Sequence, residues 1–149
     1  MTDGSEIGRT ELTADSPFTL PGFFDELAAG RLLGAECSDC GQSMIPPRPA
    51  CYGCGSRAME AVEQPRTGEV VARTAVHRPA PAFEAMAPIT LAVVELESGA
   101  RLTGRVTVPR EELAIGDAVR LTVREPTDPE LAAALSYETE WPIHEFEPA

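Results

Sequence analysis

Residues 35–56, AECSDCGQSMIPPRPACYGCGS, contain all four cysteines of the chain. Cys37 and Cys40 form one C-x2-C pair, and Cys51 and Cys54 form a second pair after ten intervening residues. Glycine follows the second cysteine of each pair, and glycine readily takes the positive φ that folds backbone amides around a thiolate. Two such turns facing each other supply four sulfur atoms in the tetrahedral arrangement that zinc accepts. The spacing therefore predicts a zinc ribbon.

Other roles for these cysteines fit the pattern less well. Disulfides are uncommon in chains without export signals, and a redox pair would need one C-x-x-C at a strand-to-helix junction. Iron shares the tetrahedral thiolate geometry of zinc and stays open as the second candidate. A shell of four cysteines leaves no position for water or substrate, so the metal is expected to be structural.

Length and composition indicate a soluble globular chain. At 149 residues, of which 43% are hydrophobic, the chain is expected to form one domain, or one domain with a small appendage. The first residues, MTDGSEIGRTELTADSPF, lack the basic and apolar regions of a signal peptide. No apolar run approaches the ~20 residues that a membrane span requires. We therefore expect a cytoplasmic protein.

The charge is strongly one-sided. The chain carries 24 acidic and 12 basic residues, for a net charge of −12, and every basic residue is arginine. Such a surface would repel a phosphate backbone. The same composition is also expected of a protein adapted to high salt, and that interpretation is favoured here. Screening by salt would then leave the net charge uninformative about partners.

The segment before the cysteines is predicted to be helical over residues 17–34. Phe23, Phe24, Leu27 and Leu32 recur near a 3.6-residue period, and Gly30 is a predicted interruption. Its apolar face could pack on its own domain or dock on a partner, and the sequence favours neither interpretation.

The segments after the ribbon have the alternation of half-buried strands. In residues 101–108, for example, Leu102, Val106 and Val108 alternate with arginine and threonine. The last predicted strand places Tyr137 and Trp141 on one side. The predicted strands are 68–78, the two arms of a hairpin in 87–109 that turns near 97–100, 115–125 and 135–146. About five strands with a short helical insert predict a small Greek-key barrel of OB type.

The predicted fold is therefore mainly β. It consists of a flexible arm at 1–16, an N-terminal helical segment at 17–34, a rubredoxin-like zinc ribbon at 35–62, and a five-stranded OB-type domain at 63–149.

Catalytic patterns are scarce in this sequence. His77 and His144 lie far apart with no motif around them and are expected at the surface or at strand ends. The pair Glu111 and Glu112 is expected in a solvated turn. The sequence contains no G-x-S-x-G, H-E-x-x-H or phosphate-binding glycine loop. We expect no intrinsic catalysis.

The loop 77–88, HRPAPAFEAMAP, is unusually long for a connection between barrel strands, and long loops are often functional. One interpretation is that Phe83 and Met86 cover one end of the barrel. The other is a binding edge, with Arg78 available to an anionic ligand.

The order of these parts resembles a known family. GRLLGAECSDCGQSMIPPRPACYGCGS, then GEVVARTAVHR, PITLAVVELESGARLTGRV and ELAIGDAVRLTV are similar to OB-fold proteins with an N-terminal rubredoxin-like zinc ribbon that accompany thiolases and other acyl-CoA enzymes. The resemblance covers roughly residues 17–125, and residues 126–149 fall outside it. The absence of lysine and the acidic excess resemble a haloarchaeal member.

The resemblance implies a non-catalytic accessory subunit. Archaeal members bridge acetoacetyl-CoA thiolase and hydroxymethylglutaryl-CoA synthase and help to pass the intermediate between them. Bacterial relatives pair with thiolase-like lyases or with hydratases of steroid side-chain degradation. The metal ligands of the family correspond to Cys37, Cys40, Cys51 and Cys54. As residues that contact CoA we nominate Arg78, Phe83 and Arg101.

Two rival functions remain. A ribbon joined to a barrel could bind nucleic acid, although a single-strand binder should interleave aromatic and basic residues along one face. Here arginine alternates with threonine, and only eight residues are aromatic (five Phe, two Tyr and one Trp). The other rival is a stand-alone acyl-CoA-binding protein.

Overall fold

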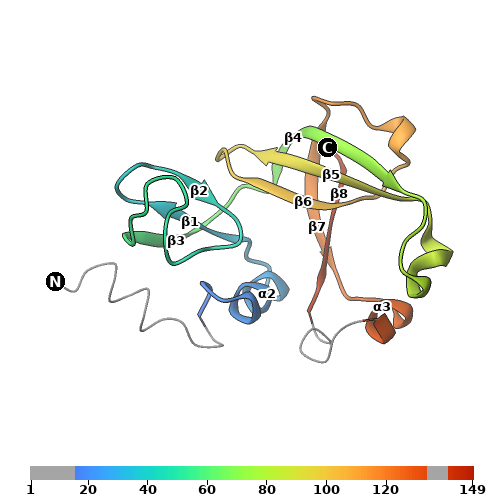
Figure 1. Ribbon diagram of the computed structural model, residues 1–149, viewed down its shortest axis with the longest axis horizontal. Coiled ribbons are helices and arrows are strands. Elements are labelled where there is room, and N and C mark those ends of the chain that lie inside the picture. Colours follow the sequence, from blue (N-terminus) through green and yellow to red (C-terminus); the bar gives the residue numbers. More distant parts are fainter. Residues whose placement is uncertain (1–15, 134–140) are drawn as a thin grey trace. The chain divides into compact units, whose positions relative to one another are not determined.

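The computed structural model describes residues 16–133 and 141–149 (Figure 1). These residues form two compact units. The first unit comprises residues 16–65 together with 97–101, and the second comprises 66–96, 102–133 and 141–149. Among the described residues, no helix is long and apolar enough to cross a membrane.

The first unit begins with helix α2, Leu20–Ala28. Thr19 caps its start by accepting a hydrogen bond at its Oγ1 from the amide of Gly22. Its end is a Schellman motif: Gly30 has φ +94°, its amide donates to Leu27, and the amide of Arg31 donates to Glu26.

The prediction of helix through residue 34 is wrong beyond Ala28, because the left-handed Gly30 turns the chain out of the helix. Strand β1, Leu33–Cys37, follows instead. Phe23 and Leu27 are buried, and α2 contacts β1. The helix therefore packs on its own unit.

The ribbon of the first unit is a three-stranded antiparallel sheet in the order β2-β1-β3. Strand β2 is Ser43–Met44 and β3 is Met59–Glu63, and Ala35 of β1 lies opposite Met44 on one side and Ala61 on the other. The small core of the sheet consists of Ala35, Cys37, Met44, Cys51 and Met59, with Phe18 packed against it. Two of its five members are cysteines, so a metal would form part of this core.

The second unit is a closed five-stranded barrel in the order β4-β5-β6-β8-β7. Its strands are β4 Thr67–Val76, β5 Ile89–Leu96, β6 Arg101–Val106, β7 Ala118–Arg124 and β8 Ile143–Pro148. Strand β8 closes the barrel by running parallel to β6 and antiparallel to β7. The mainly β prediction of a zinc-ribbon fold followed by an OB-type barrel is confirmed.

Burial along the barrel strands follows the expected period of two. In β5, Thr90, Ala92, Val94 and Leu96 point inward and the residues between them are only half-buried. Phe146 of β8, which is paired with Val106 of β6 and Leu121 of β7, is fully buried as well. The last strand is Ile143–Pro148; Trp141, which was predicted to belong to it, precedes it, and Tyr137 lies outside the described residues.

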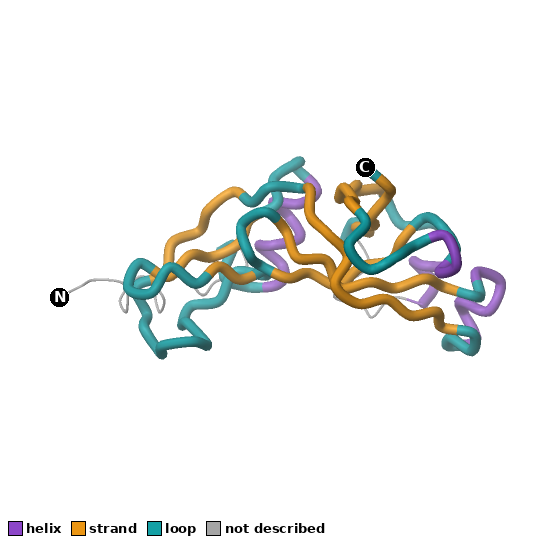
Figure 2. The backbone as a smooth tube through the Cα atoms, turned by 90° about the horizontal axis from the view of Figure 1, so that it is seen from above, coloured by secondary structure: helices purple, strands orange, loops and turns teal. Residues whose placement is uncertain are grey.

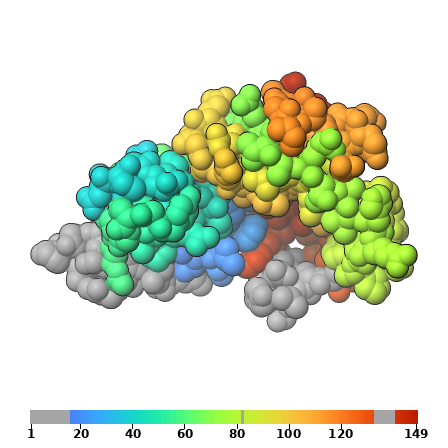
Figure 3. All heavy atoms as spheres, turned by 45° about the horizontal axis from the view of Figure 1, so that its top comes forward, coloured from blue at the N-terminus to red at the C-terminus, as the bar shows by residue number. Residues whose placement is uncertain are grey.

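Short helical segments fill the connections of the barrel. They are the 3-10 helices η1 Pro81–Met86 and η2 Arg110–Glu112, and the helix α3 Asp128–Ala133. Helices η1 and α3 lie side by side at one end of the barrel (Figures 1 and 2). In the space-filling view the η1 segment, in light green, bulges outward from the barrel strands (Figure 3).

Candidate metal centre and barrel pocket

The structure brings the four cysteines together. Their sulfur atoms all lie within 4.8 Å of one another, and the pairs Cys37–Cys54 and Cys40–Cys51 are each 3.6 Å apart. Four thiolates bound to one zinc ion at about 2.3 Å would lie about 3.8 Å from each other. The donor atoms therefore have the chemistry and spacing that a tetrahedral metal ion requires.

The glycine after each cysteine pair has the predicted conformation. Gly41 has φ +79° and Gly55 has φ +78°. The amide of Gly41 donates to the carbonyl of Cys37 at 2.8 Å, and that of Gly55 donates to Cys51 at 2.9 Å. The two turns are thus near-copies of each other, as expected from the repeated C-x2-C-G sequence.

The thiols differ in acidity. A hydrogen bond from the backbone amide of Cys40, opposed by burial, lowers the pKa of Cys37 to about 7. At Cys54 the amide of Ser56 acts in the same direction, but hydrogen bonding with the Cys37 sulfur, burial and the other two thiols outweigh it and raise its pKa to about 12. A thiolate at Cys37 therefore makes deprotonation of Cys54 harder. A divalent cation among the sulfur atoms would stabilise several thiolates at once.

Side chains around the cysteines link one turn to the other. Ser56 donates a hydrogen bond to the carboxylate of Asp39, and Gln42 Nε2 donates to the hydroxyl of Tyr52 at 3.1 Å. These links are not predictable from the sequence, because contacts between two loops carry no spacing signal. They add contacts between the two turns beside the sulfur atoms.

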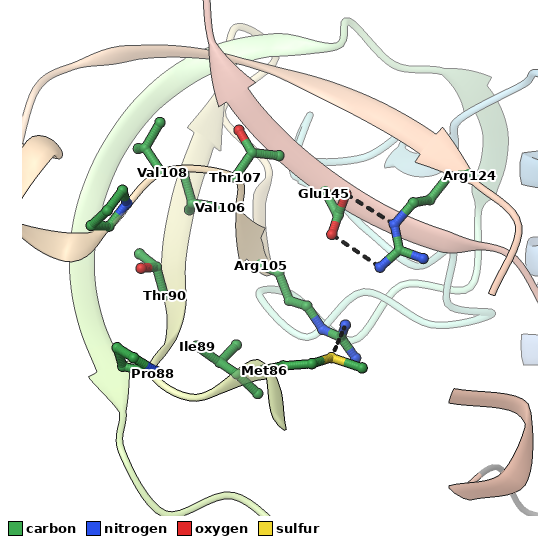
Figure 4. Close-up of a pocket in the computed structure, with 11 residues that line it drawn as sticks. Met86, Pro88, Ile89, Thr90, Arg105, Val106, Thr107, Val108, Arg124 and Glu145 are labelled. Atoms are coloured by element: carbon green, nitrogen blue, oxygen red, sulfur yellow. Dashed lines mark hydrogen bonds and ion pairs between the residues drawn. The ribbon is translucent and has the colours of Figure 1, made fainter. Parts of the chain in front are cut away.

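A pocket of about 370 Å3 lies in the barrel unit. Its walls come from the end of the η1 loop, from β5 and from β6, and Arg124 and Glu145 complete them. In Figure 4, Arg105 reaches toward Met86, and Arg124 faces Glu145. The apolar walls and the few charged groups are typical of small-molecule sites.

An ion-pair cluster adjoins this pocket. Arg124 donates to both carboxylate oxygens of Glu130, at 2.8 and 3.0 Å, and its Nε lies 3.1 Å from Glu145 Oε1. Arg105 also donates to Glu130, whose side chain is only 2% exposed. Hydrogen bonding from Arg124, opposed by burial and supported by the amide of Thr127 and by Arg105, holds the pKa of Glu130 well below its usual range.

The three residues nominated for CoA lie outside the pocket lining. Arg78 is exposed beyond the end of β4, and the half-buried Phe83 on η1 lies 5.5 Å below the Arg105 guanidinium. Arg101 is exposed at the first position of β6 and belongs to the first compact unit. The sequence does not predict Arg105 and Arg124 as binding residues, because both fit the polar positions of alternating strands equally well.

The histidines lie at barrel positions without a catalytic partner among the described residues. His77 is exposed directly after β4, and His144 of β8 makes a hydrogen bond of 2.9 Å between its Nε2 and the carbonyl of Thr103. Residues 126–149, which fall outside the resemblance, contain α3 and β8. They thus supply the fifth barrel strand and the buried Glu130.

Two domain families match the chain. Residues 24–60 match "ChsH2, rubredoxin-like zinc ribbon domain", and residues 61–124 match "ChsH2, C-terminal OB-fold domain". The Ltp2-ChsH2(DUF35) aldolase, a solved structure, covers 85% of this chain and 91% of its own chain with a TM-score of 0.66 and 29% identity.

Curated relatives agree with these matches. A "DUF35 domain-containing scaffold protein" of Pyrococcus furiosus is 37% identical over 95 residues, which are 63% of this chain and 69% of that protein. A "Probable enoyl-CoA hydratase alpha subunit" of Thermomonospora curvata is 36% identical over 125 residues, which are 83% of this chain but 37% of that protein. The chain therefore belongs to the ChsH2/DUF35 family, in which a rubredoxin-like zinc ribbon precedes a C-terminal OB-fold domain.

Proposed function

We propose that the chain is a non-catalytic accessory subunit of an acyl-CoA-processing complex. It bridges a thiolase, or a thiolase-like enzyme, to a second enzyme such as hydroxymethylglutaryl-CoA synthase and assists transfer of the CoA-bound intermediate. The observation that carries the proposal is the similarity to proteins named scaffold proteins, which reaches 37% identity. The names of two further matches, an aldolase that joins Ltp2 to ChsH2(DUF35) and a hydratase subunit, support a role beside acyl-CoA enzymes.

The metal in this proposal is zinc with a structural role. Cys37, Cys40, Cys51 and Cys54 would provide all four ligands, which leaves no coordination position for a substrate. Zinc binding would supply folding free energy to a sheet whose apolar core has few members. Iron is the alternative occupant, because it accepts the same four thiolates.

Contact with CoA is assigned to Arg78, Phe83 and Arg101. Arg78 and Arg101 are exposed guanidinium groups that can meet a phosphate, and Phe83 lies on the η1 loop near Arg78 in the sequence. In this proposal CoA is held jointly with a partner enzyme. Tight binding of CoA by the isolated chain would instead favour a stand-alone acyl-CoA-binding protein.

The test is co-purification from the native host at the salt concentration of that host. The tagged full chain is expected to recover a thiolase and a second acyl-CoA enzyme, identified by mass spectrometry, and Cys51→Ser is expected to reduce that recovery. The purified chain alone should have no thiolase or synthase activity. Recovery of nucleic acid only, or turnover by the chain alone, would contradict the accessory role.

A further inference from the structure

The barrel pocket has an apolar wall together with two arginines, Arg105 and Arg124, and one carboxylate, Glu145. Met86, Pro88, Ile89, Val106, Val108 and Pro109 provide the wall. The pocket volume of about 370 Å3 falls within the range of small-molecule sites. We propose that this pocket binds an uncharged, mainly apolar molecule whose carbonyl oxygen accepts a hydrogen bond from Arg105. One of the residues assigned to CoA, Phe83, contacts Arg105 beside this pocket, but the proposal does not depend on the accessory role.

Arg105 is fixed on one side by the protein. Its Nη1 donates to the buried carboxylate of Glu130 and lies 3.9 Å from the sulfur of Met86. Its guanidinium lies over the ring of Phe83, 5.5 Å from the ring centre. Glu130 lies on α3, and Met86 and Phe83 lie on η1. Contacts with both elements therefore hold the Arg105 guanidinium in one orientation at the pocket.

Part of the same guanidinium remains available to a ligand. Within the described part of the chain, every hydrogen bond of Arg105 leaves from Nη1. Nε and Nη2 are therefore donors that a ligand oxygen can use. The side chain is 24% exposed, so these donors are partly withdrawn from water. A hydrogen bond from a cationic donor is stronger than one between two neutral groups.

The charge balance of the site favours an uncharged ligand. Arg105 and Arg124 carry two positive charges, and Glu130 and Glu145 carry two negative charges that are paired with them. An anionic ligand would thus gain no net attraction and would lose its hydration. A cationic ligand would be repelled by the arginines and would also lose its hydration. A carbonyl oxygen can accept the hydrogen bond without bringing a charge into the pocket.

The proposal is tested with three probes of equal chain length: 2-octanone, octanoate and octylamine. Each is titrated into the 15N-labelled full chain, and binding is followed through the backbone amide signals of the residues that line the pocket. The ketone is expected to shift these signals with an affinity at least fivefold higher than that of octanoate or octylamine. Tighter binding of either charged probe would overturn the proposal, as would the absence of shifts with the ketone.

Two variants assign the interaction to the pocket. Arg105→Lys retains a cation beside Glu130 but loses Nε and Nη2, so ketone affinity is expected to fall at least fivefold. Val108→Phe fills the pocket and is expected to abolish ketone binding even if the lysine variant folds poorly. Ile115→Phe adds the same ring at a position that is 60% exposed and outside the pocket lining, and should leave binding unchanged. Unaltered ketone affinity in Val108→Phe would overturn the proposal.

Discussion

Glu130 of α3 and Arg124 of β7 form a bidentate ion pair, with Nη1 donating to Oε1 at 2.8 Å and Nη2 donating to Oε2 at 3.0 Å. The same carboxylate accepts hydrogen bonds from Arg105 and from the amide and hydroxyl of Thr127. A single buried side chain thus joins α3 to strands β6 and β7. The end of the barrel that carries the pocket depends on this one carboxylate.

Glu130→Gln should destabilise the barrel by about 2 to 3 kcal/mol, because two arginines would lose their shared counter-ion. The loss is less than for a fully buried pair, since the side chains of Arg105 and Arg124 are 24% and 35% exposed. Urea denaturation at constant salt measures the change. The matched control is Glu147→Gln, which breaks the exposed Arg120–Glu147 pair and should cost less than about 1 kcal/mol. Equal losses in the two variants would contradict the central role of Glu130.

The same carboxylate should make the protein sensitive to acid. The Arg124 hydrogen bond keeps the pKa of Glu130 below its ordinary value of 4.5, so the unfolded state takes up a proton before the folded state does. The contribution of Glu130 to stability is therefore complete above pH 4.5 and is lost as the pH falls toward the pKa of the folded state.

Unfolding free energies from about pH 6 to about pH 3 test this dependence. The native chain should lose stability more steeply below pH 4.5 than Glu130→Gln does. Glu147→Gln should follow the native curve. Parallel curves for the native chain and Glu130→Gln would show that another group controls the acid response.

Metal removal should unfold the ribbon and leave the barrel intact. The small core of the ribbon contains Cys37 and Cys51, whereas the barrel core contains no cysteine. A structural zinc ion contributes about 10 kcal/mol or more of apparent binding free energy at neutral pH. A chelator, or Cys51→Ser, should therefore erase the dispersed amide signals of β1 to β3 and preserve those of β4 to β8.

Elemental analysis should find one zinc ion per chain in the native protein and a reduced content in Cys51→Ser. Ser38→Ala, at an exposed position in the first turn, should retain the metal. A folded ribbon in the metal-free protein would contradict a structural role, and one iron ion per chain would replace zinc as the occupant.

The parts that the sequence predicts well are those encoded by short-range pattern. The repeated C-x2-C-G places two glycines with positive φ, and the alternation in residues 101–108 identifies Val106 as an inward residue of β6. The predicted helix is too long because Leu32 fits a helical period as well as it fits a buried position before strand β1. The positive φ of Gly30 decides between these two conformations, and the sequence does not show it.

The pocket and its ion pairs could not be found in this way. Arg105, Arg124, Glu130 and Glu145 come from separate elements, and they meet only because β8 inserts between β6 and β7. That insertion pairs β6 with a strand about forty residues later, and no local spacing encodes it. Acidic residues are abundant in this chain, so the buried carboxylate of Glu130 is not distinguishable in the sequence.

Gly68 is required where β4 passes between its two neighbours in the barrel. It lies opposite Leu96 of β5 and Val119 of β7, and a Cβ atom added to it would lie 2.3 Å from the carbonyl oxygen of Glu95 and 2.8 Å from the Leu96 Cα. Both contacts are with backbone atoms, which cannot rotate away. Gly68→Ala should therefore destabilise the barrel by about 1 to 3 kcal/mol, the usual cost of overpacking.

Thermal and urea denaturation of the zinc-loaded chain measure this effect, and the barrel signals in the amide spectrum report where the structure loosens. Glu69→Ala is the matched control, because its side chain is exposed on the same strand and surface changes of this kind stay within about 0.5 kcal/mol. If Gly68→Ala were as stable as Glu69→Ala, β4 could shift enough to accommodate a Cβ atom at residue 68. The pairing of β4 with β5 and β7 would then not explain why glycine is required there.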